Sequence, residues 1–122
     1  MQTGRDMGAP ARAGAASTPR ARLARAALDA ARSLPQVAGG VRGAQGVWAT
    51  ADADGLLEGV TAVARVDGRY DVELHLVAQW PIGSLYALAD EVRGRVARAA
   101  DRSGLADTVG EVSVSFEDVR EP

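Results

Sequence analysis

The feature that most constrains this fold is the alternation of apolar and polar residues in two neighbouring segments, 60–66 and 71–80. In the first segment, one face would carry Val60, Ala62, Ala64 and Val66. In the second, one face would carry Val72, Leu74, Leu76, Ala78 and Trp80, and the other Asp71, Glu73, His75, Val77 and Gln79. Period-two alternation is typical of β-strands with one buried face. Because Asp67-Gly68 between the two segments favours a tight turn, the pattern predicts an antiparallel hairpin.

After Trp80-Pro81 the apolar residues recur every three or four positions, which is typical of a helix with one buried face. That face would carry Ile82, Leu85, Leu88, Ala89, Val92, Val96 and Ala99. The opposite side would carry Asp90, Glu91, Arg93, Arg95, Arg98 and Arg102. Gly83 or Ser84 is suited to cap the start of this helix, and Gly104 followed by Leu105 is typical of its end.

A second helix is predicted near the beginning of the chain and a further strand at its end. Thr18 can cap a helix that has Pro19 in its first turn and that ends before Pro35. The thin apolar stripe of this helix comprises Leu23, Ala27, Ala30 and Leu34. In the closing strand, the expected inward residues are Val112, Val114 and Phe116, and the outward ones are Ser113, Ser115 and Glu117.

These elements predict an α+β domain of two layers in the order α-β-β-α-β. We expect a small, mainly antiparallel three-stranded sheet with two helices on one face. Residues 36–58 are rich in glycine and are expected to form an irregular connection with a short strand at 47–50. A chain of 122 residues allows one domain, placed at residues 18–122. Glycine and proline interrupt residues 1–17, which are expected to form a disordered basic N-terminal tail.

The composition excludes several kinds of chemistry. There is no cysteine, so disulfides, thiolate metal sites and a cysteine nucleophile are excluded, and a reducing compartment is expected. A single histidine, His75, excludes any centre that needs two imidazoles from one chain. No stretch approaches the ~20 apolar residues of a membrane-spanning helix, and the N-terminus lacks the apolar region of a secretory signal. We therefore expect a cytoplasmic protein.

Charge is divided unevenly along a chain whose net charge is −2. Residues 1–42 hold seven Arg and two Asp, a net charge of +5, whereas residues 43–122 hold seven Arg and fourteen acidic residues, a net charge of −7. The preference for Arg over Lys is typical of a GC-rich genome. The alternative is a basic arm selected to contact anionic lipid or nucleic acid. The uneven division also permits head-to-tail association between copies.

Few residues are placed to carry chemistry. His75 and Glu73 share a strand face and could exchange protons, but no nucleophile or oxyanion stabiliser accompanies them. Ca²⁺ could bind Asp52, Asp54 and Glu58, yet their spacing differs from that of an EF-hand loop and favours a solvated turn. We therefore predict no catalytic residue, no metal site and no cofactor.

Three further patterns suggest binding. The GVRG sequence at residues 40–43 matches the loop by which KH domains clamp nucleic acid, but a helix is predicted only before it, which favours a flexible loop. Trp48 and Trp80 could stack on a base or sugar, although burial in the core or in a partner surface is preferred. An anion could contact Arg93, Arg95, Arg98 and Arg102. Nearby counter-charges come from Asp90, Glu91 and Asp101, which favours a solvated helix face instead.

Three segments of the chain together resemble the alkaline shock protein family of bacterial envelope-stress proteins. They are GVTAVARVDGRYDVELHLVAQW, LYALADEVRGRVARAADRSGL and VGEVSVSFEDV. The shared features are a Gly-Val opening, an alternating hairpin strand, an amphipathic helix with a Val-Arg element and a closing Val-x-Val strand with a final Asp-Val. Because SLPQVAGG resembles the family's short link after the first helix, the resemblance covers about Ser33 to Val119.

The resemblance implies a non-enzymatic cytoplasmic protein that forms a homo-oligomer and gathers at the inner face of the membrane through a membrane-anchored protein partner. It implies no catalytic residues and no small-molecule substrate. Open sheet edges and exposed apolar residues also favour an interaction role. One alternative is a small RNA-binding module that uses the basic N-terminal arm, which the net charge of −7 over residues 43–122 disfavours. The other is an enzyme subunit completed by a second chain, with His75 and Glu73 as its candidates.

Overall fold

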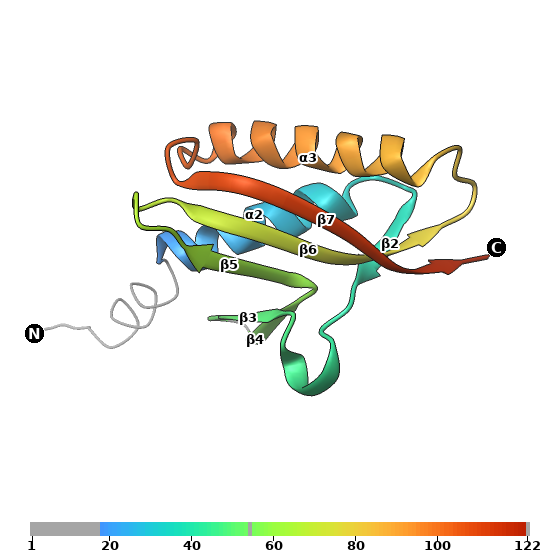
Figure 1. Ribbon diagram of the computed structural model, residues 1–122, viewed down its shortest axis with the longest axis horizontal. Coiled ribbons are helices and arrows are strands. Elements are labelled where there is room, and N and C mark those ends of the chain that lie inside the picture. The colour runs from blue at the N-terminus through green and yellow to red at the C-terminus, as the bar shows by residue number, and fades with distance from the viewer. Residues whose placement is uncertain (1–17, 54, 122) are drawn as a thin grey trace, which may run out of the picture.

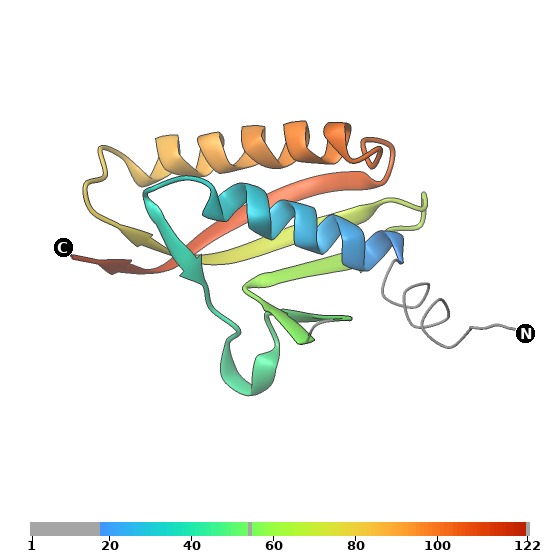
Figure 2. The same ribbon diagram turned by 180° about the vertical axis from the view of Figure 1, so that it is seen from behind.

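The structure, a computed structural model, describes residues 18–53 and 55–121 and has two layers, with two helices over one face of a sheet (Figure 1). From behind, α2 crosses in front of the sheet, and α3 runs above it beside β7 (Figure 2). The elements in chain order are α2 (Pro19–Arg32), β2 (Val37–Gly40), the 3₁₀ helix η1 (Ala44–Gly46), β3 (Ala49–Asp52), β4 (Gly55–Glu58), β5 (Val60–Ala64), β6 (Tyr70–Gln79), α3 (Leu85–Arg102) and β7 (Val109–Arg120). The tail predicted over residues 1–17 lies outside the described residues.

The strand β6 organises the main sheet because three strands pair with it. On one edge, β5 runs antiparallel to residues 70–74 and β2 runs antiparallel to residues 76–78. On the other edge, β7 runs parallel to β6 along residues 70–79. The remaining strands, β3 and β4, form a separate two-stranded antiparallel sheet.

The α+β class and the two helices over one face are confirmed, but the predicted sheet is wrong in two respects. It has four strands rather than three, and the pair formed by β6 and β7 is parallel. The parallel pair follows from the helix between the two strands. At about 1.5 Å per residue, the 18 residues of α3 return the chain over ~27 Å, which is close to the length of β6. The next strand therefore starts beside the start of β6 and runs in the same direction.

The additional strands also change the predicted order α-β-β-α-β, because they lie where an irregular connection was expected. The sequence of β2 is VAGG, and its two glycines remove any alternating pattern. Both β3 and β4 have only four residues, and the short strand predicted at 47–50 begins at Ala49 instead. Pairing, rather than local sequence, defines strands this short: β2 pairs with the distant β6, and β3 pairs with β4.

Most of the predicted core faces are confirmed. The stripe of α2 is buried, as are the predicted inward residues of α3 from Leu88 to Ala99. The buried residues of β6 are Val72, Leu74, Leu76 and Ala78. Packed against this core from β7 are Val112, Val114 and Phe116. The inward and outward faces predicted for the closing strand are therefore correct.

Four apolar residues predicted on buried faces are exposed instead. Trp80 is 48% exposed, Leu85 is 40% exposed, Val66 is fully exposed and Ala64 is also exposed. All four lie at or beyond the ends of their elements, because β5 ends at Ala64, β6 ends at Gln79 and α3 begins at Leu85. The alternation in the sequence continues for longer than the strands themselves.

The predicted caps are confirmed at the start of both helices and at the end of α3. Thr18 and Ser84 each accept a hydrogen bond, at 3.2 Å, from a backbone N–H in the first turn of α2 and α3. Ser84 rather than Gly83 is therefore the cap of α3, which starts later than the apolar pattern suggests. After α3, Gly104 adopts a φ of +72° and is followed by the buried Leu105.

The end of β2 meets the start of β5 at a close backbone approach between Gly40 and Gly59. The backbone of His75 bonds to both segments, because Val41 N donates to His75 O at 2.9 Å and His75 N donates to Gly59 O at 2.8 Å. Gly59 adopts a φ of +94°, and a Cβ on it would lie 2.4 Å from Gly40 Cα. Only glycine fits there. Gly40 of the GVRG sequence thus has a packing role in the sheet.

Candidate functional site

The first candidate site is a polar cluster around His75 on the face of the sheet opposite the helices. His75 Nδ1 lies 2.9 Å from Glu117 Oε2 of β7, and His75 Nε2 lies 3.3 Å from Glu73 Oε1. Ser115 Oγ donates to the same Glu117 oxygen at 2.6 Å. The proximity of His75 and Glu73 is therefore as predicted, and the parallel strand β7 adds two residues that were not expected there, Ser115 and Glu117.

Trp48 covers this cluster from the connection between β2 and β3. Its indole ring stacks on the imidazole of His75 with ring centroids 4.1 Å apart and planes 2° apart. The indole also lies close to Gly43, where an added Cβ would be 2.8 Å from the ring. The second glycine of the GVRG sequence thus makes room for Trp48.

Hydrogen bonds lower the pKa of Glu117. The hydroxyl of Ser115 makes the largest contribution and His75 the next, because both stabilise the ionised carboxylate. The Glu117 side chain is 28% exposed, so solvent reaches it in part. The cluster consequently favours a negative charge on Glu117.

The geometry around His75 favours anchoring over proton transfer. Glu117 and Glu73 engage both ring nitrogens, Trp48 covers one ring face, and the His75 side chain is only 12% exposed. A general base needs a ring nitrogen within reach of the substrate proton. In this arrangement the imidazole instead fixes the connection between β2 and β3 against the sheet.

The two described residues that were considered for Ca²⁺, Asp52 and Glu58, do not come together. Asp52 pairs with Gly55 at the turn of the β3–β4 hairpin, whereas Glu58 is at its other end, opposite Ala49. Asp52 forms an ion pair with Arg25 of α2, and Arg25 Nε donates to Asp52 Oδ2 at 2.8 Å. This hydrogen bond is the main cause of the lowered pKa of Asp52. Asp54 lies outside the described residues.

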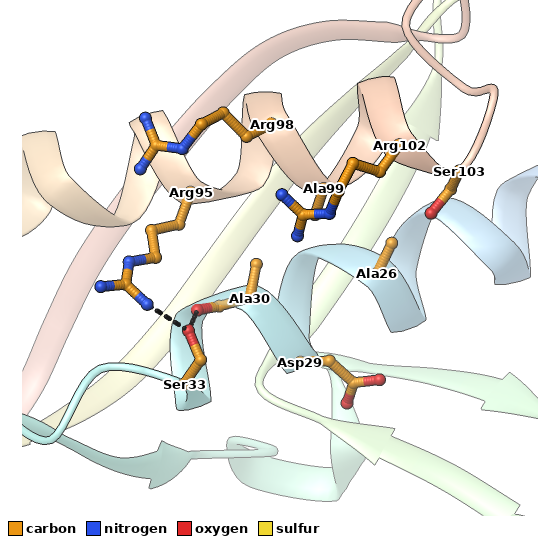
Figure 3. A pocket seen from close by; sticks show the side chains of 9 residues that line it. All are labelled: Ala26, Asp29, Ala30, Ser33, Arg95, Arg98, Ala99, Arg102 and Ser103. Carbon is orange, nitrogen blue, oxygen red and sulfur yellow. Dashed lines mark hydrogen bonds between the residues drawn. The ribbon is translucent and has the colours of Figure 1, made fainter.

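The second candidate site is a groove of about 650 Å³ between α2 and α3, which we call the arginine groove (Figure 3). Small side chains of both helices line it, including Ala26, Ala30 and Ala99. Its charged lining from α3 comprises Arg95, Arg98 and Arg102. Steps of three and four residues place the three arginines on one side of α3.

The arginines of α3 divide into two groups. Arg93 is held by Asp90 at 2.5 Å, as expected for a solvated helix face. Arg95 reaches across the arginine groove and donates to Ser33 Oγ at 3.0 Å. Within the part of the chain that the structure describes, Arg98 and Arg102 form no ion pair and no side-chain hydrogen bond. Their guanidinium groups are therefore available to a ligand.

The third candidate site is an apolar surface at one end of the molecule. Trp80 N donates to Arg120 O at 3.1 Å, so the end of β6 lies beside the end of β7. The start of α3 lies at the same end (Figure 1). The exposed apolar residues of these segments are Trp80 (48%), Leu85 (40%), Tyr86 (89%) and Val119 (37%), and we call them the apolar end. Trp48 and Trp80 thus have different surroundings, since Trp48 stacks on His75 and Trp80 belongs to an exposed apolar surface.

The described residues were also searched for a metal site and for a membrane-spanning helix. Over residues 18–53 and 55–121, no group of three or more His, Asp or Glu side chains is arranged to hold a metal ion. No helix of this same part is both long and apolar enough to cross a membrane.

Three comparisons with known proteins gave no match for this chain: a scan against protein-family models, a search of curated proteins and a search of solved structures.

Proposed function

We propose that this protein is a non-enzymatic interaction protein that self-associates by pairing the outer edges of β7 from two copies. The observation that carries this proposal is the length of β7, which has 12 residues and pairs only with β6 among the described strands. An edge strand presents a row of N–H and C=O groups to any strand that approaches it. Antiparallel pairing of two such edges would join two sheets around a two-fold axis.

The opposite edge of the sheet is less suited to such pairing. It consists of two short strands, β5 with five residues and β2 with four, which meet at the close contact of Gly40 with Gly59. Short and interrupted strands are a common protection against edge pairing. The contrast between the two edges supports β7 as the interface.

The apolar end supports the same interface because it adjoins the C-terminal end of β7. Tyr86 is 89% exposed and Trp80 is 48% exposed, and aromatic side chains of this kind are enriched at protein interfaces. Burial of these two rings against a second copy would add apolar contact to the backbone pairing. Self-association by β7 therefore combines a backbone edge with an apolar anchor.

The non-enzymatic part of the proposal is supported by the surroundings of His75. It is the single histidine of the chain, and Glu117, Glu73 and Trp48 engage its ring. The resemblance to the alkaline shock protein family points in the same direction. We extend the proposal to a cytoplasmic, envelope-stress role in which the oligomer gathers at the membrane through an anchored protein partner.

Light scattering coupled to size-exclusion chromatography tests this proposal. At tens of micromolar, a concentration suited to weak interfaces, we expect a mass above that of the monomer. Ser113→Lys should return the protein to the monomer, because lysine on an edge strand opposes edge pairing. Val63→Lys on the opposite edge is the matched control. Ser113 pairs with Glu73 and Val63 pairs with Asp71, so each new lysine would lie beside an acidic residue of β6.

A second pair of variants tests the apolar end. Tyr86→Ala should weaken self-association, whereas Val66→Ala, at another fully exposed apolar residue, should leave it unchanged. A wild-type protein that remains monomeric at several hundred micromolar would refute the proposal. Equal dissociation by the two lysine variants would also refute it, because that result would remove the distinction between the edges.

RNA binding through the basic N-terminal arm is the alternative. Its supporting observation is the +5 charge of residues 1–42, and the −7 charge of the remainder opposes it. A strict monomer that retains single-stranded RNA at physiological salt would favour this alternative. We expect weak RNA binding that decreases steeply as salt rises.

A further inference from the structure

The arginine groove carries an inference that goes beyond self-association. The interface proposed above uses the outer edge of β7 and the apolar end, whereas the groove lies between the two helices that cover one face of the sheet (Figures 2 and 3). The small side chains that line the groove leave a space of about 650 Å³ beside Arg95, Arg98 and Arg102. This space is large enough for a small organic ligand.

The charge of the groove is unbalanced. Three arginines line it, and its single acidic lining residue is Asp29, whose carboxylate points away from the guanidinium group of Arg102 (Figure 3). Arg22 adds positive charge at the end of the groove near Ser103, where it donates to the Ser103 carbonyl at 3.2 Å. The described residues thus supply more positive than negative charge to this space.

We propose that the arginine groove binds a phosphate group with two negative charges, such as a phosphomonoester or a diphosphate. A guanidinium group presents planar N–H donors that match two oxygens of a phosphate, so Arg98 and Arg102 would each donate a pair of hydrogen bonds. Arg95 is already oriented by Ser33, at 3.0 Å, and would complete the site from one end. The phosphate belongs either to a free compound or to a lipid headgroup.

Calorimetric titration with inorganic pyrophosphate tests the free-compound source. We expect saturable binding to the wild-type protein, and a loss of about tenfold in affinity for each of Arg98→Ala and Arg102→Ala. Arg93→Ala is the matched control, because it removes the same charge from the same helix outside the groove and should change the affinity less than twofold. Arg102→Lys keeps the charge but lacks the planar donor set, so we expect an affinity between those of the wild type and Arg102→Ala.

Sedimentation with vesicles tests the lipid source. The probes are phosphatidylcholine vesicles with phosphatidic acid, a phosphomonoester, and matched vesicles with phosphatidylglycerol, a phosphodiester. Binding to phosphatidic acid that is lost in Arg102→Ala and kept in Arg93→Ala supports a lipid source, and pyrophosphate binding with the same pattern supports a free compound. Absence of binding in both experiments overturns the inference. An equal effect of Arg93→Ala and Arg102→Ala also overturns it, because the binding would then depend on overall charge alone.

Discussion

The indole ring of Trp48 lies flat on the imidazole ring of His75, with their centroids 4.1 Å apart. Trp48 belongs to the connection between β2 and β3, and His75 belongs to the central strand of the sheet. This contact therefore attaches an otherwise irregular segment to β6. Glu117 and Glu73 hold the imidazole in place through its two nitrogens.

The two tryptophans are expected to differ in their effect on stability. Trp48→Ala should lower the free energy of unfolding by about 2–4 kcal/mol, because it removes the stacked ring and leaves a gap beside Gly43. Trp80→Ala should lower it by less than about 1 kcal/mol, because that ring is already 48% exposed. Urea denaturation of the three proteins measures the difference. A larger effect at Trp80 would show that the Trp48 ring does not hold the connection.

Glu117 should contribute to acid sensitivity. Its pKa is lowered in the folded protein, mainly by Ser115 and then by His75, relative to about 4.3 in an unfolded chain. The stability it contributes is present above the unfolded pKa and is lost as the pH falls through the lower, folded pKa. Glu117→Gln should therefore reduce stability at pH 7 and flatten its decrease below about pH 4.

This acid sensitivity can be measured by urea denaturation at a series of pH values. Asp52 also has a lowered pKa, so its contribution is lost in the same direction and some pH dependence should remain in Glu117→Gln. Glu111→Gln, which removes an exposed carboxylate from the same strand outside the cluster, is the matched control for the change in charge. Identical pH profiles for wild type and Glu117→Gln would contradict the assigned role of the cluster.

The two faces of β7 should respond differently to truncation. Phe116→Ala should cost about 3 kcal/mol of stability because the ring packs against the core, whereas Ser113→Ala on the exposed face should be nearly silent. Thermal unfolding of the two variants provides the comparison. If the serine variant were the less stable one, the faces assigned to β7 would be reversed.

Salt should act in opposite directions on the two proposed interactions. Copies that approach along β7 bring together regions of net charge −7, so added salt should screen their repulsion and strengthen self-association. Binding of pyrophosphate to the arginine groove depends on attraction between opposite charges, so the same salt should weaken it. Light scattering and calorimetry from about 20 to 200 mM salt follow the two effects separately. A parallel response of both would indicate that one of them is a nonspecific charge effect.

The sequence predicted those parts of the fold whose periodicity extends over several residues. The alternation of Val72, Leu74 and Leu76 identified β6, and the spacing of Leu88, Val92 and Val96 identified α3. β2 and β4 were missed, and β3 was predicted two residues too early, because four residues, in β2 including two glycines, produce no clear period. The conformation of β2 depends on pairing with β6, far away in the chain, which local sequence does not encode.

The candidate sites were less predictable than the fold for a related reason. Glu73 and His75 are two residues apart on one strand, and their proximity could be inferred from the strand period alone. Glu117 and Trp48 reach His75 only through the parallel pairing of β7 and through the connection after β2. The arginine groove likewise depends on how α2 packs against α3. Spacing placed its three arginines together but gave no information about the neighbouring helix.

The central position of β6 also determines the order in which the chain can fold. Among the described pairings of β6, only the hairpin with β5 joins neighbouring segments, whereas the pairings of Val37 with Ala78 and of Val72 with Val112 each close a long loop. Long-range pairings of this kind slow folding, since the loop entropy is lost before the contacts form. Until β7 docks, the newly made chain exposes an edge of β6 that the native protein covers. Edge pairing between copies therefore competes with folding on the ribosome and shortly after release.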